Sequence, residues 1–132
     1  MLKIPHYQKD ISVSEQHIDR LGHVNNTVYL NWLLEMASEH WQRSAPKVYQ
    51  NKYRWVVRRH EIDYLKPAYE GETLMATTWV DEMGGVQSLR RVQLKRGNEL
   101  IMNALTRWIL IDAKTGKLAR IPADLIDLYL SY

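Results

Sequence analysis

The sequence predicts an α+β fold in which one five-stranded antiparallel sheet is wrapped around one long central helix. A helical pattern over 27–43 is apolar around most of its circumference, as is typical of a buried helix. From about residue 54 onward the chain reads as extended segments joined by short turns, which favours antiparallel pairing. With 132 residues, 45% of them hydrophobic, the chain is expected to form a single domain over 1–132.

The first predicted strand lies within 8–18, where Ile11 and Val13 alternate with polar neighbours. The turn-like cluster DRLGHVNN follows. Asn25 or Asn26 then suits the N-cap of the helix, because its side-chain oxygen can accept a backbone N–H that has no partner inside the helix.

The predicted helix carries its polar residues in one narrow stripe and is otherwise apolar. Such a helix must be covered by other elements of the fold. The stripe consists of Asn31, Glu35, Ser38, Glu39 and Gln42.

The rest of the chain supplies the cover. A loop over 44–53 leads into four predicted strands, and Gly84-Gly85 is typical of a tight hairpin between two of them. Pro122 can open a terminal helix over 123–130 as its first residue. The strands are expected at 54–66, 73–83, 86–96 and 99–112.

The strand over 54–66 is a candidate edge strand, because its apolar residues do not alternate cleanly. An open sheet leaves unpaired edges, and pairing an edge with its own copy is a common solution. We therefore expect a homodimer or a dimer of dimers.

Composition and motifs exclude several classes of function. The chain has no cysteine, so thiolate catalysis and cysteine metal sites are excluded. It has no GxGxxG, GxxxxGK[ST], HExxH or GxSxG motif, and its histidines lack metal-ligand spacing. We expect no metal and no cofactor.

Charge and hydropathy predict the kind of partner and the cellular location of the protein. The 18 basic residues exceed the 15 acidic ones by only +3 and form no basic block, so no nucleic-acid partner is expected. There is no apolar run long enough for a membrane span and no secretory leader, so a cytoplasmic protein is expected.

One carboxylate lies close to the start of the helix. Asp19 precedes Gly22 by three residues, and the helix begins within about a turn. Free N–H groups and the positive end of the helix dipole can polarise a carbonyl oxygen, while a nearby carboxylate attacks the carbonyl or activates a water. The plainer alternative is that Asp19 only caps a turn.

The string DRLGHVNNTVYLNWLLEMASEHW resembles the signature of hot-dog-fold acyl thioesterases of the 4-hydroxybenzoyl-CoA-thioesterase-like group. DYLKPAYEGETL is similar to the second strand and following turn of that family. The resemblance implies a hot-dog fold and hydrolysis of an acyl-CoA to free acid and CoA. It implies a catalytic Asp19, a polarising backbone N–H near Asn26, Gly22 and His23 in the same turn, and Tyr29 beside the acyl pocket.

The sequence departs from the family at two places. Many members carry Asp-x-Asp, whereas His17 stands at the first position here. Plant acyl-ACP thioesterases, which the HVNN string also resembles, carry an Asn where Leu21 stands, but His23 matches their histidine. An acyl-ACP thioesterase, a non-catalytic acyl-thioester-binding module and a β-hydroxyacyl dehydratase or hydratase therefore remain alternatives.

Basic residues on the predicted strands could meet the phosphates of CoA. Neighbours on a strand point to opposite faces, so at most one of Arg58 and Arg59, and one of Arg90 and Arg91, is expected to do so. Arg59 and Arg91 are the candidates.

Overall fold

The computed structural model describes residues 6–130, and it consists of one sheet, one long helix and shorter helical segments. The elements in chain order are β1 (His6–Ser12), the short 3₁₀ helix η1 (Glu15–His17), α1 (Asn26–Ser44), α2 (Lys47–Lys52), β2 (Tyr53–Tyr64), β3 (Thr73–Gly84), β4 (Gln87–Arg96), β5 (Glu99–Asp112) and α3 (Ala123–Leu130).

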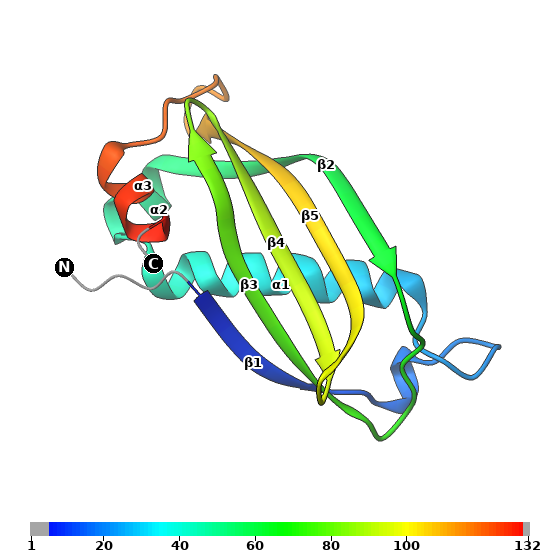
Figure 1. Cartoon of the computed structure of the whole chain (residues 1–132). Helices are drawn as coiled ribbons and strands as arrows, with labels where there is room; N and C mark the ends of the chain where they lie inside the picture. The colour runs from blue at the N-terminus through cyan, green and yellow to red at the C-terminus, as the bar shows by residue number, and fades with distance from the viewer. Residues whose placement is uncertain (1–5, 131–132) are drawn as a thin grey trace.

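The sheet has five antiparallel strands in the order β1-β3-β4-β5-β2, and it curls around α1 (Figure 1). The predicted fold is thus confirmed, as is the position of β2 at an edge of the sheet. The loops around 19–25 and 65–72 lie at the end where α1 begins, while α2 and α3 lie at the end where it finishes (Figure 1).

Helix α1 starts at a side-chain cap. Asn25 accepts hydrogen bonds from the Thr27 backbone N–H and hydroxyl, both at 2.9 Å, as the N-cap prediction requires. The polar stripe is exposed, with one exception. Glu39 is half-buried and accepts hydrogen bonds from Tyr7 and Lys9 of β1, which tie the helix to the first strand.

Two predicted boundaries were wrong. The extended stretch over 8–18 ends at Ser12, because the Ser14 N–H donates to Nδ1 of His17 and this capping box starts η1. The predicted loop over 44–53 contains α2. Gln50 of that helix donates to the carbonyls of Gln42 and Ala45 at the end of α1, which satisfies groups that the helix itself leaves free.

The core follows the length of α1 in two clusters. The larger one surrounds Leu33 and Met36, both with no exposed area, and includes Leu74 and Leu94 of the sheet. The smaller one joins α3 to the sheet around Tyr129. No helix within residues 6–130 combines the length and apolar character needed to span a membrane.

Candidate active site at the start of helix α1

The sequence between η1 and α1 folds back on itself and places Asp19 in a tight turn. Backbone hydrogen bonds join Asp19 to His23 and Asn25 to His17, and a bridge links Ile18 to Val24. The Asp19 Oδ1 accepts from the Leu21 N–H at 2.8 Å. The other oxygen lies 3.8 Å from the His23 Nδ1, and the Asp19 side chain stays partly accessible. The structure therefore brings Asp19, Gly22 and His23 together in one turn.

The first backbone amide of α1 is free to bind a ligand. Asn25 caps the Thr27 N–H with its side chain and the Val28 N–H with its carbonyl. The Asn26 N–H, by contrast, donates to no acceptor among residues 6–130. A free amide at the positive end of a 19-residue helix can polarise an oxygen atom.

Gly22 allows the turn its shape. Its φ of +83° lies in the left-handed region, which costs a residue with a Cβ about 1 kcal/mol. We expect Gly22→Ala to lower the unfolding free energy by about that amount in a urea titration, and to lower activity because the turn holding Asp19 must shift. Gly84→Ala is the matched control, since Gly84 has ordinary φ and nothing within 4 Å of an added Cβ. Equal losses in both variants would contradict this reading of Gly22.

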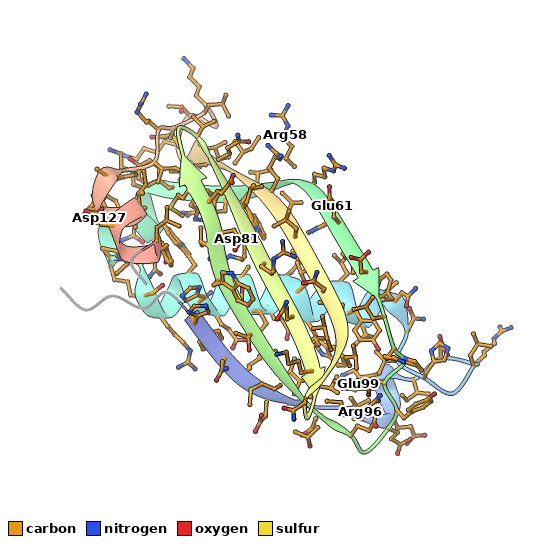
Figure 2. The ribbon with its side chains drawn as sticks, in the orientation of Figure 1. Arg58, Glu61, Asp81, Arg96, Glu99 and Asp127 are labelled. Carbon is orange, nitrogen blue, oxygen red and sulfur yellow. The ribbon has the colours of Figure 1, made fainter. Side chains whose placement is uncertain are left out.

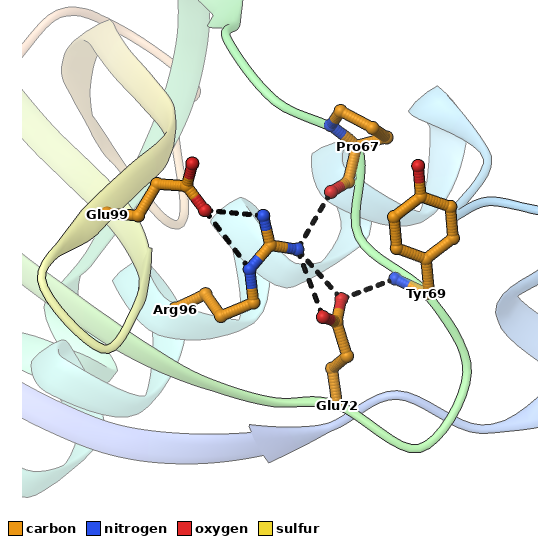
Figure 3. Close-up of polar contacts among 5 residues, drawn as sticks. All are labelled: Pro67, Tyr69, Glu72, Arg96 and Glu99. Atoms are coloured by element: carbon orange, nitrogen blue, oxygen red, sulfur yellow. Dashed lines mark hydrogen bonds and ion pairs between the residues drawn. The ribbon is translucent and has the colours of Figure 1, made fainter.

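A second loop supports the turn from the other side. The carbonyl of Ala68 accepts from the Val24 N–H at 2.8 Å. This loop is held by Arg96 of β4, which donates to the Pro67 carbonyl and to the carboxylates of Glu72 and Glu99 (Figure 3). The Arg96 guanidinium holds the pKa of Glu99 below its ordinary value.

Tyr29 lies one turn into α1 and is almost fully buried. Its ring packs on Trp32 and on Tyr64 at the end of β2, with centroid distances of 5.7 and 5.5 Å. Burial raises the pKa of its hydroxyl. Tyr29 does not line the aromatic cavity described next, so its expected place beside an acyl pocket stays a prediction.

A cavity of about 380 Å³ lies between the second half of α1, the start of β2 and the inner face of β4 and β5. Its wall is largely aromatic and apolar, with Trp41, Trp55, Trp108, Leu34 and Tyr129. Arg90 of β4 also lines it and is 7% exposed. The sequence carried a signal for this position, because Arg90 is in phase with the buried Val92 and Leu94 of the same strand.

Three arginines gather around a second hollow. Arg58, Arg59 and Arg107 line it together with Gln87. At most one of Arg58 and Arg59 was expected from the sequence to meet CoA phosphates, because neighbours on a regular strand point to opposite faces; here both line one hollow. The pairing of β2 with β5 is irregular between Val57 and Arg59, and such a bulge interrupts the alternation of side chains.

Arg91 lies apart from that cluster. Its Nε pairs with Asp81 at 3.3 Å and its Nη1 donates to Asn103, so neighbouring side chains already occupy its guanidinium. Figure 2 shows Asp81 on the sheet and Arg58 on β2, with Arg96 and Glu99 at the far end of the sheet. Arg59 is also ion-paired, with Glu61 at 2.8 Å, but both side chains are largely exposed.

Over residues 6–130 no group of three or more His, Asp or Glu side chains is placed to hold a metal ion. The turn and the helix start present one carboxylate, one neighbouring imidazole and one free amide.

One antiparallel sheet curled around one long helix is the hot-dog fold of acyl thioesterases, as the resemblance in the sequence indicated. A family model described as the acyl-ACP thioesterase N-terminal domain matches residues 5–129. The chain belongs to that family.

Known proteins agree on the class. The long-chain acyl-CoA thioesterase FadM of Escherichia coli K12 is 26% identical over 122 residues, covering 89% of this chain and 92% of its own. The chloroplastic acyl-[acyl-carrier-protein] hydrolase FATB3 of Cuphea viscosissima is 27% identical over 82 residues, 61% of this chain but 20% of that protein. These relatives support thioester hydrolysis as the general activity.

A solved structure supports the fold. The 1,4-dihydroxy-2-naphthoyl-CoA thioesterase of Synechocystis superposes with a TM-score of 0.80 and covers 96% of each chain, at 14% identity.

Proposed function

We propose that this chain, acting as a single domain over 1–132, hydrolyses an acyl-CoA thioester to the free acid and CoA. The observation that carries the proposal is the turn before α1. This turn holds the Asp19 carboxylate by a hydrogen bond and leaves it partly accessible, and the first backbone amide of α1 is free. An acyl thioester needs both groups, because its carbonyl carbon is attacked while its oxygen gains negative charge.

The proposed step is a water attack. Asp19 takes a proton from a water, whose oxygen forms a bond to the carbonyl carbon while the Asn26 N–H donates to the carbonyl oxygen. The tetrahedral intermediate then expels the thiolate, which takes up a proton as free CoA. A thiol has a pKa of about 8.5, so the thiolate leaves readily without a strong acid. His23 lies next to the carboxylate, with its Nδ1 3.8 Å from Asp19 and 3.3 Å from the Val24 carbonyl oxygen.

We propose that the working unit is a dimer formed through β2. This edge strand exposes Val56 and Tyr64. It runs antiparallel to α1, since Tyr64 at its end contacts Tyr29 and Trp55 near its start contacts Trp41. If two β2 strands pair antiparallel about a two-fold axis, the last residues of β2 in one subunit, which lie near the start of its α1, come beside the cavity of the partner.

In that dimer the cavity of each subunit lies next to the Asp19 turn of the other subunit. The partner's Asp19 lies at the mouth of the cavity whose wall contains Trp41 and Trp55. The acyl group then occupies an aromatic pocket between subunits, and the pantetheine arm reaches it from the surface.

We propose that the cluster of Arg58, Arg59 and Arg107 meets the phosphates of CoA. Arg59→Gln is then expected to raise KM for an acyl-CoA about two- to fivefold, the range for one exposed charge pair, with little change in kcat. The effect should shrink as ionic strength rises.

The comparison substrate is the matching acyl-pantetheine, which has no phosphate. KM for it should be the same in Arg59→Gln and the wild type, and Lys95→Gln, an exposed position on β4, should behave as the wild type with both substrates. A similar rise in KM with both substrates would contradict the phosphate role.

Acyl carrier protein is the second candidate carrier, because the matching family model and the plant relative are both described by it. Thiol release from matched acyl-CoA and acyl carrier protein substrates decides between the two carriers. Turnover of the carrier protein substrate alone would replace CoA in the proposal. Absence of turnover on both, from a folded dimer, would leave a binding module.

A further inference from the structure

Arg90 is a buried cation in the wall of the cavity. It projects from β4 on the inner face of the sheet, in phase with Val92 and Leu94, and 7% of its surface is exposed. Burying a charged guanidinium is costly unless a counter-ion and hydrogen bonds compensate it.

The protein compensates Arg90 only in part. Its Nη1 donates to the His40 Nδ1 at 2.8 Å and to the Thr78 hydroxyl at 3.1 Å. Because the guanidinium can only donate, the His40 Nδ1 is the acceptor in this contact. Among residues 6–130 no carboxylate pairs with Arg90, and its Nε and Nη2 groups make no hydrogen bond.

The charge of Arg90 persists at neutral pH. Burial lowers the pKa of Arg90 to about 10, while the hydroxyl of nearby Tyr129 acts in the opposite direction. The guanidinium is thus still protonated at pH 7, in a cavity whose described wall includes a second arginine, Arg54, and no acid.

The wall near Arg90 has a surplus of donors. Trp108 pairs across the strands with Ser88, two residues from Arg90, and all three line the cavity. The indole Nε1 of Trp108 is buried with no acceptor among the described residues. The same cavity is aromatic along Trp41 and Trp55, so it combines an apolar length with an end where Arg90 and Trp108 carry N–H groups that make no hydrogen bond within residues 6–130.

We propose that Arg90 binds a carboxylate at the far end of the acyl group, so that the preferred substrates are thioesters of acyl chains carrying a second acid group. The proposal rests on the proposed function in one respect, which is that the cavity holds the acyl group. A carboxylate would supply both the missing counter-ion and an acceptor for the unused N–H groups of Arg90.

Binding of probes that carry no thioester tests the proposal separately from thioester hydrolysis. The probes are decanedioic acid monomethyl ester and its dimethyl ester, which match in length and differ by one carboxylate. Tryptophan fluorescence reports occupancy, because Trp41, Trp55 and Trp108 line the cavity. We expect the wild type to bind the monoacid at least about tenfold more tightly than the diester.

Variants assign the preference to Arg90. Arg90→Met should bring the two affinities together, Arg90→Lys should retain part of the difference because it keeps a cation, and Lys95→Met on the same strand should retain all of it. If Arg90→Met does not fold, the wild-type comparison and Arg90→Lys still decide. Equal binding of both esters by the wild type, or an undiminished preference in Arg90→Met, overturns the proposal and shows that Arg90 only ties the sheet to α1.

Turnover separates this proposal from the proposed function. ω-Carboxyacyl-CoAs of increasing chain length are compared with plain acyl-CoAs of equal length. Turnover of both kinds with no preference for the acid overturns the role of Arg90 and leaves thioester hydrolysis in place. Tighter binding of the monoacid without turnover of any thioester overturns hydrolysis and supports the carboxylate site.

Discussion

Asp19→Asn is expected to lower kcat/KM for an acyl-CoA by about 100-fold or more, because an amide cannot accept the proton of the attacking water. The substitution keeps the shape of the side chain. Its Oδ1 can still accept from the Leu21 N–H, so the turn and the free amide of Asn26 should remain in place. Thiol release from a panel of acyl-CoAs measures the effect.

The control for this experiment is Asp10→Asn, which neutralises an exposed carboxylate on β1, away from the turn. It should match the wild type in activity and in unfolding midpoint. Equal activity of Asp19→Asn and the wild type would mean that Asp19 is only a turn cap. A lowered unfolding midpoint in Asp19→Asn alone would assign the loss of activity to structure instead of chemistry.

Leu33→Ala is expected to destabilise the protein by about 3 kcal/mol. Leu33 has no exposed area and lies in the larger core cluster, where α1 meets the sheet. The loss combines the transfer free energy of the deleted carbons with the cavity they leave. Urea titration at fixed protein concentration should show a lower midpoint with an unchanged slope.

Leu118→Ala makes the same deletion at a side chain that is 65% exposed, and should change the unfolding free energy by less than about 0.5 kcal/mol. If the two variants lost equal stability, α1 would not be packed in the core as described. A loss of cooperativity in Leu33→Ala would show instead that the sheet holds its shape without the helix.

Local patterns predicted most of the fold. The apolar residues around the helix over 27–43 indicated a covered helix, and the short turn at Gly84-Gly85 indicated antiparallel strands, because both signals act over a few residues. The two misread segments, η1 and α2, are short. Helices of this length are stabilised by contacts such as the hydrogen bonds from Gln50 to the end of α1, which have no periodic signal in the sequence.

The candidate site also has a part that could be predicted from the sequence and a part that could not. The spacing of Asp19, Gly22 and the helix start could be read directly, because all of these residues lie within one turn of chain. The cavity could not, since it joins side chains from α1, β2, β4, β5 and α3 that are far apart in sequence. The bulge in β2 that places Arg58 beside Arg59 was also invisible, because it depends on the register with β5.

The fold class, the extent and N-cap of the central helix, and the turn that carries Asp19 could all be predicted from local sequence patterns. Those features depend on the preferences of neighbouring residues along the chain. Three-dimensional packing decided instead that Glu39 anchors β1, and that Arg90 lies buried in a cavity without a carboxylate among the described residues. Burial and charge pairing are set by what packs across the sheet, and a one-dimensional pattern shows which face a residue takes but not what it meets there.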